Sequence, residues 1–255
     1  MTKRKVDLVK TLEDFAEKSQ IKWEDLKKSY LKICLAKGHP QIVEAIVNTF
    51  LLQDDEKKHC VFLLGNASTG KSTVCRMMQK IFVTQKAAIN QGHFLTTSNE
   101  QETDTQLLVM EEVNWPAMLS KDQFKHVLGL LDGSGSSFKP NLYEKYAYTY
   151  AGVFTLIASN DDPFKRFTKS NSTAEQTVML PLETRWNKVD LPPRTEEELK
   201  LPISFPYTVT DLAASLLYKL HTEGRILRLR PPEGYLYDPE IIQGEVLDRE
   251  ALLEI

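Results

Sequence analysis

Apolar residues recur at helical spacing in three segments near the N-terminus. The first segment carries Val6, Val9, Leu12, Phe15 and Ala16, the second carries Trp23, Leu26, Tyr30, Ile33 and Cys34, and the third carries Ile42, Ala45, Ile46, Thr49 and Phe50. Each set would line one face of an α-helix. Gly38 supplies a helix stop, and Pro40 suits the first turn of the next helix. We predict a small three-helix bundle whose aromatic residues form a core; a collar for subunit contacts is the alternative that the pattern leaves open.

From Cys60 onward the apolar residues form short runs separated by polar or amphipathic stretches. These runs are Cys60–Leu64, Gly92–Thr96, Gln106–Met110 and Gly152–Ala158, with a further strand-like element at Pro181–Leu191. Amphipathic helices are predicted from Lys71 to about Thr84 and from Lys121 to Leu131. Strands that alternate with helices predict an α/β fold with a parallel sheet and a ligand site at the carboxyl ends of its strands.

The 255 residues suffice for one large α/β domain or two smaller ones. We expect residues 1–55 to form the helical bundle, which would also serve as an oligomerisation collar. Residues 56–205 would form the α/β core. Residues 206–255 would form a helix at Leu212–Leu220 and an irregular tail.

The first apolar run leads into a glycine-rich turn that matches the phosphate-binding loop pattern G-x-x-x-x-G-K-[ST]. The residues of this loop are Gly65, Asn66, Ala67, Ser68, Thr69, Gly70, Lys71, Ser72 and Thr73. Glycines let successive N–H groups point at one anion, and the helix that follows begins with unpaired N–H donors. Lys71 would reach the β- and γ-phosphates, and the Ser72 hydroxyl would hold Mg²⁺. The alternative is a chance match in a surface turn, but the strand before the loop and the helix after it favour binding of a nucleoside triphosphate.

Two further strands end in polar side chains that suit phosphate chemistry. Glu111 and Glu112 follow one apolar run, and a Mg²⁺-dependent NTPase needs one carboxylate near the metal and another that orients and deprotonates the attacking water. Asn160 ends the next run and would hydrogen-bond the γ-phosphate or that water. A solvated acidic turn is the alternative for the two glutamates. We therefore expect ATP and Mg²⁺ as ligands.

The segment from Asp132 to Tyr150 combines a Gly-Ser turn with interleaved aromatic and basic residues. Phe138, Lys139 and Lys145 would stack on bases and neutralise phosphates of a single strand. An ordinary exposed hairpin explains the same residues equally well.

The overall composition excludes few functions. A net charge of −3 gives no global nucleic-acid signature, so any such contact would come from a local patch or from a ring of subunits. The cysteines Cys34, Cys60 and Cys75 are widely spaced, which favours reduced structural residues of an intracellular protein over zinc ligands or disulfides. No window is apolar over the ~20 residues that a membrane span needs, so no membrane association is expected.

The order of these motifs over roughly residues 55–195 resembles the superfamily 3 helicases of small DNA viruses. That family includes the papillomavirus replication helicase, polyomavirus large T antigen and the parvovirus Rep proteins. Leu131-Asp132-Gly133 looks papillomavirus-like, whereas Ser159-Asn160, Asn171-Ser-Thr and Pro181-Leu-Glu-Thr-Arg185 look closer to parvovirus Rep. Two features depart from the family pattern: Asn66 stands where many relatives have proline, and the hairpin between Gly133 and Lys145 is longer than usual.

The resemblance implies an AAA+-like P-loop NTPase core and a role for each candidate residue. The loop would be Walker A, Glu111 the Mg²⁺-side acid of Walker B, Glu112 the catalytic base and Asn160 the sensor. Arg185 resembles the arginine finger that completes a neighbouring subunit's ATP site, although a local salt bridge with Glu183 would also explain it. Lys139 is the first choice for the contact with DNA phosphate and Lys145 the second, with Phe138 stacking or packing on sugar.

The implied function is an ATP-driven DNA helicase of viral replication that works as a ring, most simply a hexamer, on single-stranded DNA or a replication fork. The resemblance also implies work in the host nucleus. The chain contains no His-hydrophobe-His pair with a downstream tyrosine, so an origin-binding or nicking domain would lie elsewhere. Two rivals remain: an RNA-virus helicase-like NTPase that acts on RNA, and a P-loop nucleotide kinase with Phe164–Lys169 as its lid.

Overall fold

The N-terminal segment forms the three predicted helices. The computed structural model describes residues 7–51, 60–90, 93–96, 105–111, 136–138, 148–150, 154–160, 187–200, 205–225 and 227–233. The helices are α1 (Leu8–Lys18), α2 (Trp23–Cys34) and α3 (His39–Leu51). Asp7 caps α1 by accepting a hydrogen bond from the backbone N–H of Lys10 at 3.1 Å. The prediction of an N-terminal helical bundle is confirmed.

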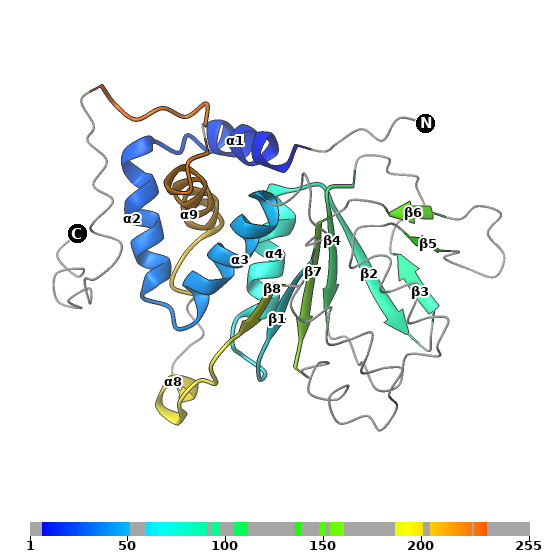
Figure 1. Cartoon of the computed structure of the whole chain (residues 1–255). Helices are drawn as coiled ribbons and strands as arrows, with labels where there is room; N and C mark the ends of the chain where they lie inside the picture. The colour runs from blue at the N-terminus through cyan, green and yellow to red at the C-terminus, as the bar shows by residue number, and fades with distance from the viewer. Residues whose placement is uncertain are drawn as a thin grey trace.

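A helix from the other end of the chain completes this bundle. Helix α9 (Val209–Thr222) contacts α1, α2, α3 and α4, and Figure 1 shows it enclosed by the N-terminal helices. The sequence predicts an amphipathic helix here, but its residues from Asp211 to Tyr218 are all buried. A helix buried on every side belongs in a core rather than at a surface. The helical layer is therefore assembled from both ends of the chain.

A six-stranded sheet lies beside the helical layer (Figure 1). Its strands are β1 (Cys60–Leu64), β2 (Thr84–Asn90), β3 (His93–Thr96), β4 (Leu107–Glu111), β7 (Phe154–Ser159) and β8 (Asn187–Asp190). They lie in the order β3-β2-β4-β7-β1-β8, and every neighbouring pair is parallel except the antiparallel pair of β2 and β3. The predicted α/β fold with a parallel central sheet is confirmed.

The chain between β1 and β4 differs from the prediction. Helix α4 (Lys71–Ile81) ends before Thr84, the residue predicted as its end, and β2 begins there instead. The reason is a long-range contact: the Val83 N–H donates to the Gln106 side chain at 3.0 Å, and the Gln106 N–H donates back to the Val83 carbonyl at 2.9 Å. A short helix α8 (Glu196–Lys200), which the sequence pattern does not predict, follows β8.

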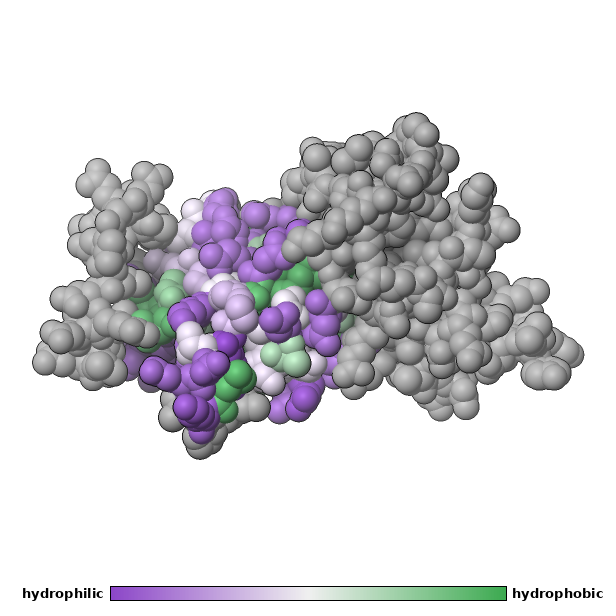
Figure 2. Space-filling view, turned by 90° about the horizontal axis from the view of Figure 1, so that it is seen from below, coloured by the Kyte–Doolittle hydropathy of each residue, from purple (hydrophilic) through white to green (hydrophobic). Residues whose placement is uncertain are grey.

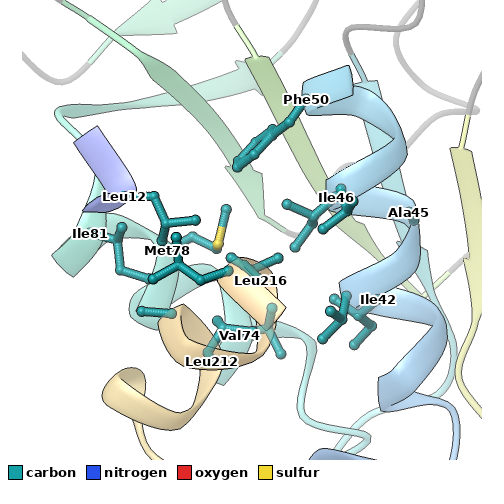
Figure 3. Close-up of a cluster of buried hydrophobic side chains, with 14 of the residues drawn as sticks. Leu12, Ile42, Ala45, Ile46, Phe50, Val74, Met78, Ile81, Leu212 and Leu216 are labelled. Atoms are coloured by element: carbon teal, nitrogen blue, oxygen red, sulfur yellow. The ribbon is translucent and has the colours of Figure 1, made fainter. Parts of the chain in front are cut away.

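The core lies between the helices and one face of the sheet. Helix α3 contacts β1 and β8, while α4 contacts β4 and β7. Figure 3 shows side chains of α1, α3, α4 and α9 converging, among them Leu12, Phe50 and Leu216. The opposite face of β1 is also closed, because Phe62 is fully buried. Burial on both faces explains why these strands read as continuous apolar runs.

The predicted hairpin is present as an antiparallel pair of short strands. Strand β5 (Ser136–Phe138) pairs with β6 (Tyr148–Tyr150), and Phe138 lies opposite Tyr148. Lys139 and Lys145 lie outside the described residues, as does the predicted helix at Lys121–Leu131.

Candidate nucleotide-binding site

The carboxyl ends of β1, β4, β7 and β8 meet at one edge of the sheet. Leu64, the last residue of β1, is in register with Ser159 of β7 and with Asp190 of β8, and Glu111 of β4 is in register with Ala158. The loop that follows Leu64 therefore begins beside Asn160, and Glu111 lies one strand further along. Figure 2 faces this edge and shows mainly hydrophilic described residues with small apolar areas between them.

Close packing explains why both glycines of the phosphate-binding loop are required. Gly65 has φ 148°, and a Cβ there would lie 2.7 Å from the carbonyl oxygen of Leu191. Gly70 has φ 95°, and a Cβ there would lie 2.7 Å from the Phe205 ring. Larger residues would be strained at both positions and would push the loop away from β8 and from Phe205.

Lys71 points back into the loop that precedes it. Its ammonium donates to the carbonyl oxygens of Gly65 and Asn66, both at 2.6 Å, and to the Thr69 hydroxyl at 3.3 Å. The side chain is buried, and burial lowers its pKa. An ammonium held among oxygens within a loop of this geometry is poised to exchange those oxygens for the oxygens of a phosphate.

The loop forms one wall of a cleft of about 540 Å³. The same cleft is lined by Lys71, Ser72 and Thr73 at the start of α4 and by Asn160 after β7. Its other wall is built by the α2–α3 turn from Leu35 to His39, by the segment from Pro192 to Arg194, and by Phe205 and Pro206. The volume falls within the range of small-molecule sites, and the positive end of α4 favours an anion there.

One buried carboxylate oxygen at this edge suits a metal ion. Glu111 Oε1 is buried and has no hydrogen-bond partner among the described residues. Carboxylate and hydroxyl oxygens are the ligands that Mg²⁺ takes from proteins, usually with bound phosphates and water. Glu111 and Ser72 therefore fit a Mg²⁺–nucleotide.

Several predicted site residues lie outside the described part of the chain. Glu112, Arg185, Lys139 and Lys145 are among them, and for Phe138 only the backbone is described. The roles predicted for these residues remain predictions.

The sequence pattern also missed residues that enclose the loop: Leu191 lies against Gly65, and Phe205 and His39 lie against Gly70. His39 stands between Gly38 and Pro40, which mark a turn, but a lone histidine at a turn carries no signal of a binding site.

Comparison with known proteins gives low similarity. No protein-family model and no curated protein sequence matches the chain. The apo structure of the NrS-1 C-terminal region aligns at 14% identity and a TM-score of 0.42, over 91% of this chain and 50% of that one. JCV Helicase aligns at 16% identity and a TM-score of 0.44, over 85% of this chain and 61% of the other. The chain thus spans about half the length of the first protein.

The sheet, the loop and the cleft define the class of fold. The fold is α/β: a phosphate-binding-loop motif follows β1 at the carboxyl edge of a mainly parallel sheet, and a small helical bundle packs beside that sheet. Among the described residues, no helix is both long enough and apolar enough to cross a membrane.

Proposed function

We propose that the chain is the motor of an ATP-driven DNA helicase. The observation that carries the proposal is the shared cleft of Lys71, Ser72 and Asn160, at the edge where the strand of Glu111 also ends. Phosphoryl transfer requires positioning and charge stabilisation far more than covalent chemistry, and these residue types supply both.

The proposed hydrolysis uses the residues as follows. The Lys71 ammonium leaves the Gly65 and Asn66 carbonyls and binds the β- and γ-phosphates, while the N–H groups at the start of α4 surround the same oxygens. Glu111 and Ser72 would hold Mg²⁺, which neutralises charge on the phosphates. Asn160 orients the attacking water, and Glu112 accepts its proton.

The proposed nucleic-acid contact is the β5–β6 ribbon. In the sequence Lys139 and Lys145 lie between Phe138, the last residue of β5, and Tyr148, the first residue of β6, and in this proposal they contact the DNA phosphates. A homo-oligomeric ring, most simply a hexamer, would gather several such ribbons around one single strand of DNA. Arg185 would complete a neighbour's ATP site. Work in the host nucleus, and an origin-binding or nicking domain elsewhere, belong to the same proposal.

We expect Lys71→Ala to abolish ATP hydrolysis, because the alanine cannot bind the γ-phosphate. Loss of a transition-state contact of this kind costs at least about 100-fold in rate. Lys80→Ala is the matched control, since Lys80 lies on α4 but is exposed at its other end. ATP hydrolysis by Lys71→Ala at the rate of the Lys80→Ala control would contradict the proposal.

The same assay identifies the substrate class. Hydrolysis is measured with single-stranded DNA, with single-stranded RNA and with a nucleoside monophosphate. Stimulation by DNA supports the helicase. Stimulation by RNA alone would favour the RNA-virus type of NTPase, and phosphorylation of the monophosphate would favour a kinase.

A further inference from the structure

Arg194 lies on the wall of the cleft that faces the phosphate-binding loop. The segment that carries it leaves β8 beside the start of that loop, because the Leu191 N–H donates to the last carbonyl of β1 at 2.7 Å. Pro192 and Pro193 follow, and their rings fix the backbone φ angle at both positions. The backbone of Arg194 is therefore held in a defined place relative to the loop.

The carboxylate nearest to Arg194 in the chain is committed to other partners. One oxygen of Glu198 accepts from the Thr195 N–H at 2.7 Å, and the other pairs with the Lys37 ammonium at 3.2 Å. The Thr195 hydrogen bond, and after it the Lys37 contact, lower the pKa of Glu198, so the carboxylate is ionised at neutral pH. Lys37 and Glu198 both line the cleft and balance each other's charge there.

The guanidinium of Arg194 has no such balance. It donates a hydrogen bond to the backbone carbonyl of Glu198, which is uncharged, and no carboxylate of the described residues forms an ion pair with it. Arg228 differs, because two carboxylates of α1 hold its guanidinium. Arg76 also lines the cleft but is exposed, whereas Arg194 is partly buried and less hydrated. A partly buried cation of this kind is best stabilised by an anionic ligand.

We propose that Arg194 binds the α-phosphate of a nucleotide held in the cleft of its own chain. In the proposed function Lys71 and Mg²⁺ bind the β- and γ-phosphates, so the α-phosphate is left for a cation on the opposite wall. The guanidinium carries several N–H donors in one plane, and those that the Glu198 carbonyl does not use can bind phosphate oxygens. The apolar side chains beside it, among them Pro192 and Phe205, suit the uncharged nucleoside that follows this phosphate.

This role concerns nucleotide binding and leaves the hydrolysis step unchanged. ATP and ADP both contain the α-phosphate, so Arg194 would hold substrate and product alike. The charge that develops on the γ-phosphate during hydrolysis is assigned to Arg185 of a neighbouring subunit. The inference therefore rests on the nucleotide-binding part of the proposed function and does not require the ring.

Two substitutions separate the charge of Arg194 from its hydrogen bond to the Glu198 carbonyl. Arg194→Lys keeps the charge and a donor for that carbonyl. Arg194→Gln keeps an amide donor but removes the charge. Arg225→Gln is the matched control, since Arg225 is exposed after α9 and is not among the described residues that line the cleft.

The measurement is the Kd of each variant for ATP, ADP, AMP and adenosine by titration calorimetry, beside its melting temperature. We expect Arg194→Gln to bind ATP, ADP and AMP about tenfold more weakly than the wild type, the effect of one charge-assisted hydrogen bond, and to bind adenosine within about threefold of it. Arg194→Lys should stay within about threefold of the wild type for all four ligands, because the charge remains. Arg225→Gln should not change any of the four.

The other outcomes overturn the inference in recognisable ways. Unchanged binding of ATP by Arg194→Gln would show that no phosphate depends on this charge. A loss confined to ATP would mean a contact with the γ-phosphate, an equal loss for adenosine a contact with the nucleoside, and equal losses in Arg194→Gln and Arg194→Lys a purely structural role. ATP binding that depends on Lys71 but not on Arg194 would overturn this inference alone. A wild-type protein that binds no nucleotide would overturn the proposed function as well.

Discussion

At the scale of single residues, two charged side chains in the candidate site, Lys71 and Glu111, would be better stabilised by a bound ligand than by the chain alone. The Lys71 ammonium donates hydrogen bonds to backbone carbonyls of its own loop, and burial of the side chain lowers its pKa. Glu111 keeps one buried carboxylate oxygen without a partner among the described residues. Unpaired buried polar atoms cost folding free energy and are kept where a function uses them.

Glu111→Gln should therefore separate stability from activity. The amide is uncharged and costs less to bury, so the melting temperature without ligand should stay the same or rise. Hydrolysis of ATP with Mg²⁺ should fall about 100-fold or more, because the metal-side charge is lost.

The matched control for this change is Glu17→Gln, since Glu17 is exposed on α1. It should leave both hydrolysis and melting unchanged. A Glu111→Gln protein that hydrolyses ATP like this control would remove Glu111 from the site.

At the scale of elements, α9 shows what the apolar pattern leaves out. The pattern predicted a helix at Leu212–Leu220, whereas α9 begins at Val209, so Asp211 belongs to its first turn. In the structure Asp211 accepts hydrogen bonds from Ser29 at 3.0 Å and from Lys32 at 3.1 Å, both on α2. It also accepts from the Thr208 N–H at 2.9 Å, which caps α9. A polar residue with buried partners far away in the sequence can lie in a core, and no local spacing reveals this.

Asp211→Asn should destabilise the protein by about 1–3 kcal/mol, the loss of a helix cap together with charge-assisted hydrogen bonds to α2. Chemical denaturation measures the effect. Asp25→Asn is the control, because Asp25 occupies the same third position of α2 but is exposed, and its loss should cost less than about 1 kcal/mol.

The pH dependence of stability gives a second test of Asp211. Burial raises its pKa, but the hydrogen bonds from the Thr208 backbone, Lys32, the Thr208 hydroxyl and Ser29 outweigh burial and hold the pKa below its usual 3.8. A depressed folded pKa stabilises the protein above the unfolded pKa, and this stability is lost as the pH falls through the folded pKa. Asp211→Asn should therefore differ most from the wild type near neutral pH and converge on it in acid. A difference that persists unchanged in acid would contradict this account.

At the scale of the whole molecule, the sequence predicted those features that depend on residues close together in the chain. The N-terminal helices, the loop, the parallel sheet and the paired strands of the hairpin all follow from spacing, glycines and apolar runs. Strand β2 was missed because its start at Thr84 depends on pairing with β4, which lies much further along the chain. The wall of the cleft opposite the loop was missed for the same reason: His39, Pro192 and Phe205 come together only after folding.

The residues that line the cleft also bear on the proposed ring. The point to decide is which second cation, besides Lys71, completes the nucleotide site for hydrolysis. Arg76 and Arg194 line the cleft alongside Lys71, so a second positive charge is available within the same chain. The ring proposal assigns that role to Arg185 of a neighbouring subunit instead. The two arrangements differ in how hydrolysis depends on assembly, since a charge supplied in trans acts only between subunits.

Mixing two inactive variants distinguishes a cation supplied by the same chain from one supplied by a neighbouring subunit. Lys71→Ala lacks the phosphate-binding lysine, and Arg185→Ala lacks the proposed finger, so each alone should hydrolyse ATP at least about 100-fold more slowly. In a mixed ring some sites combine an intact Lys71 from one subunit with an intact Arg185 from the next, and activity should reappear in proportion to those sites. Arg76→Ala serves as the control for a charge supplied in cis, and its loss should not be rescued by mixing. If Arg185→Ala retains full activity, or if mixing restores none, the second cation belongs to the same chain and the site is complete without a neighbour.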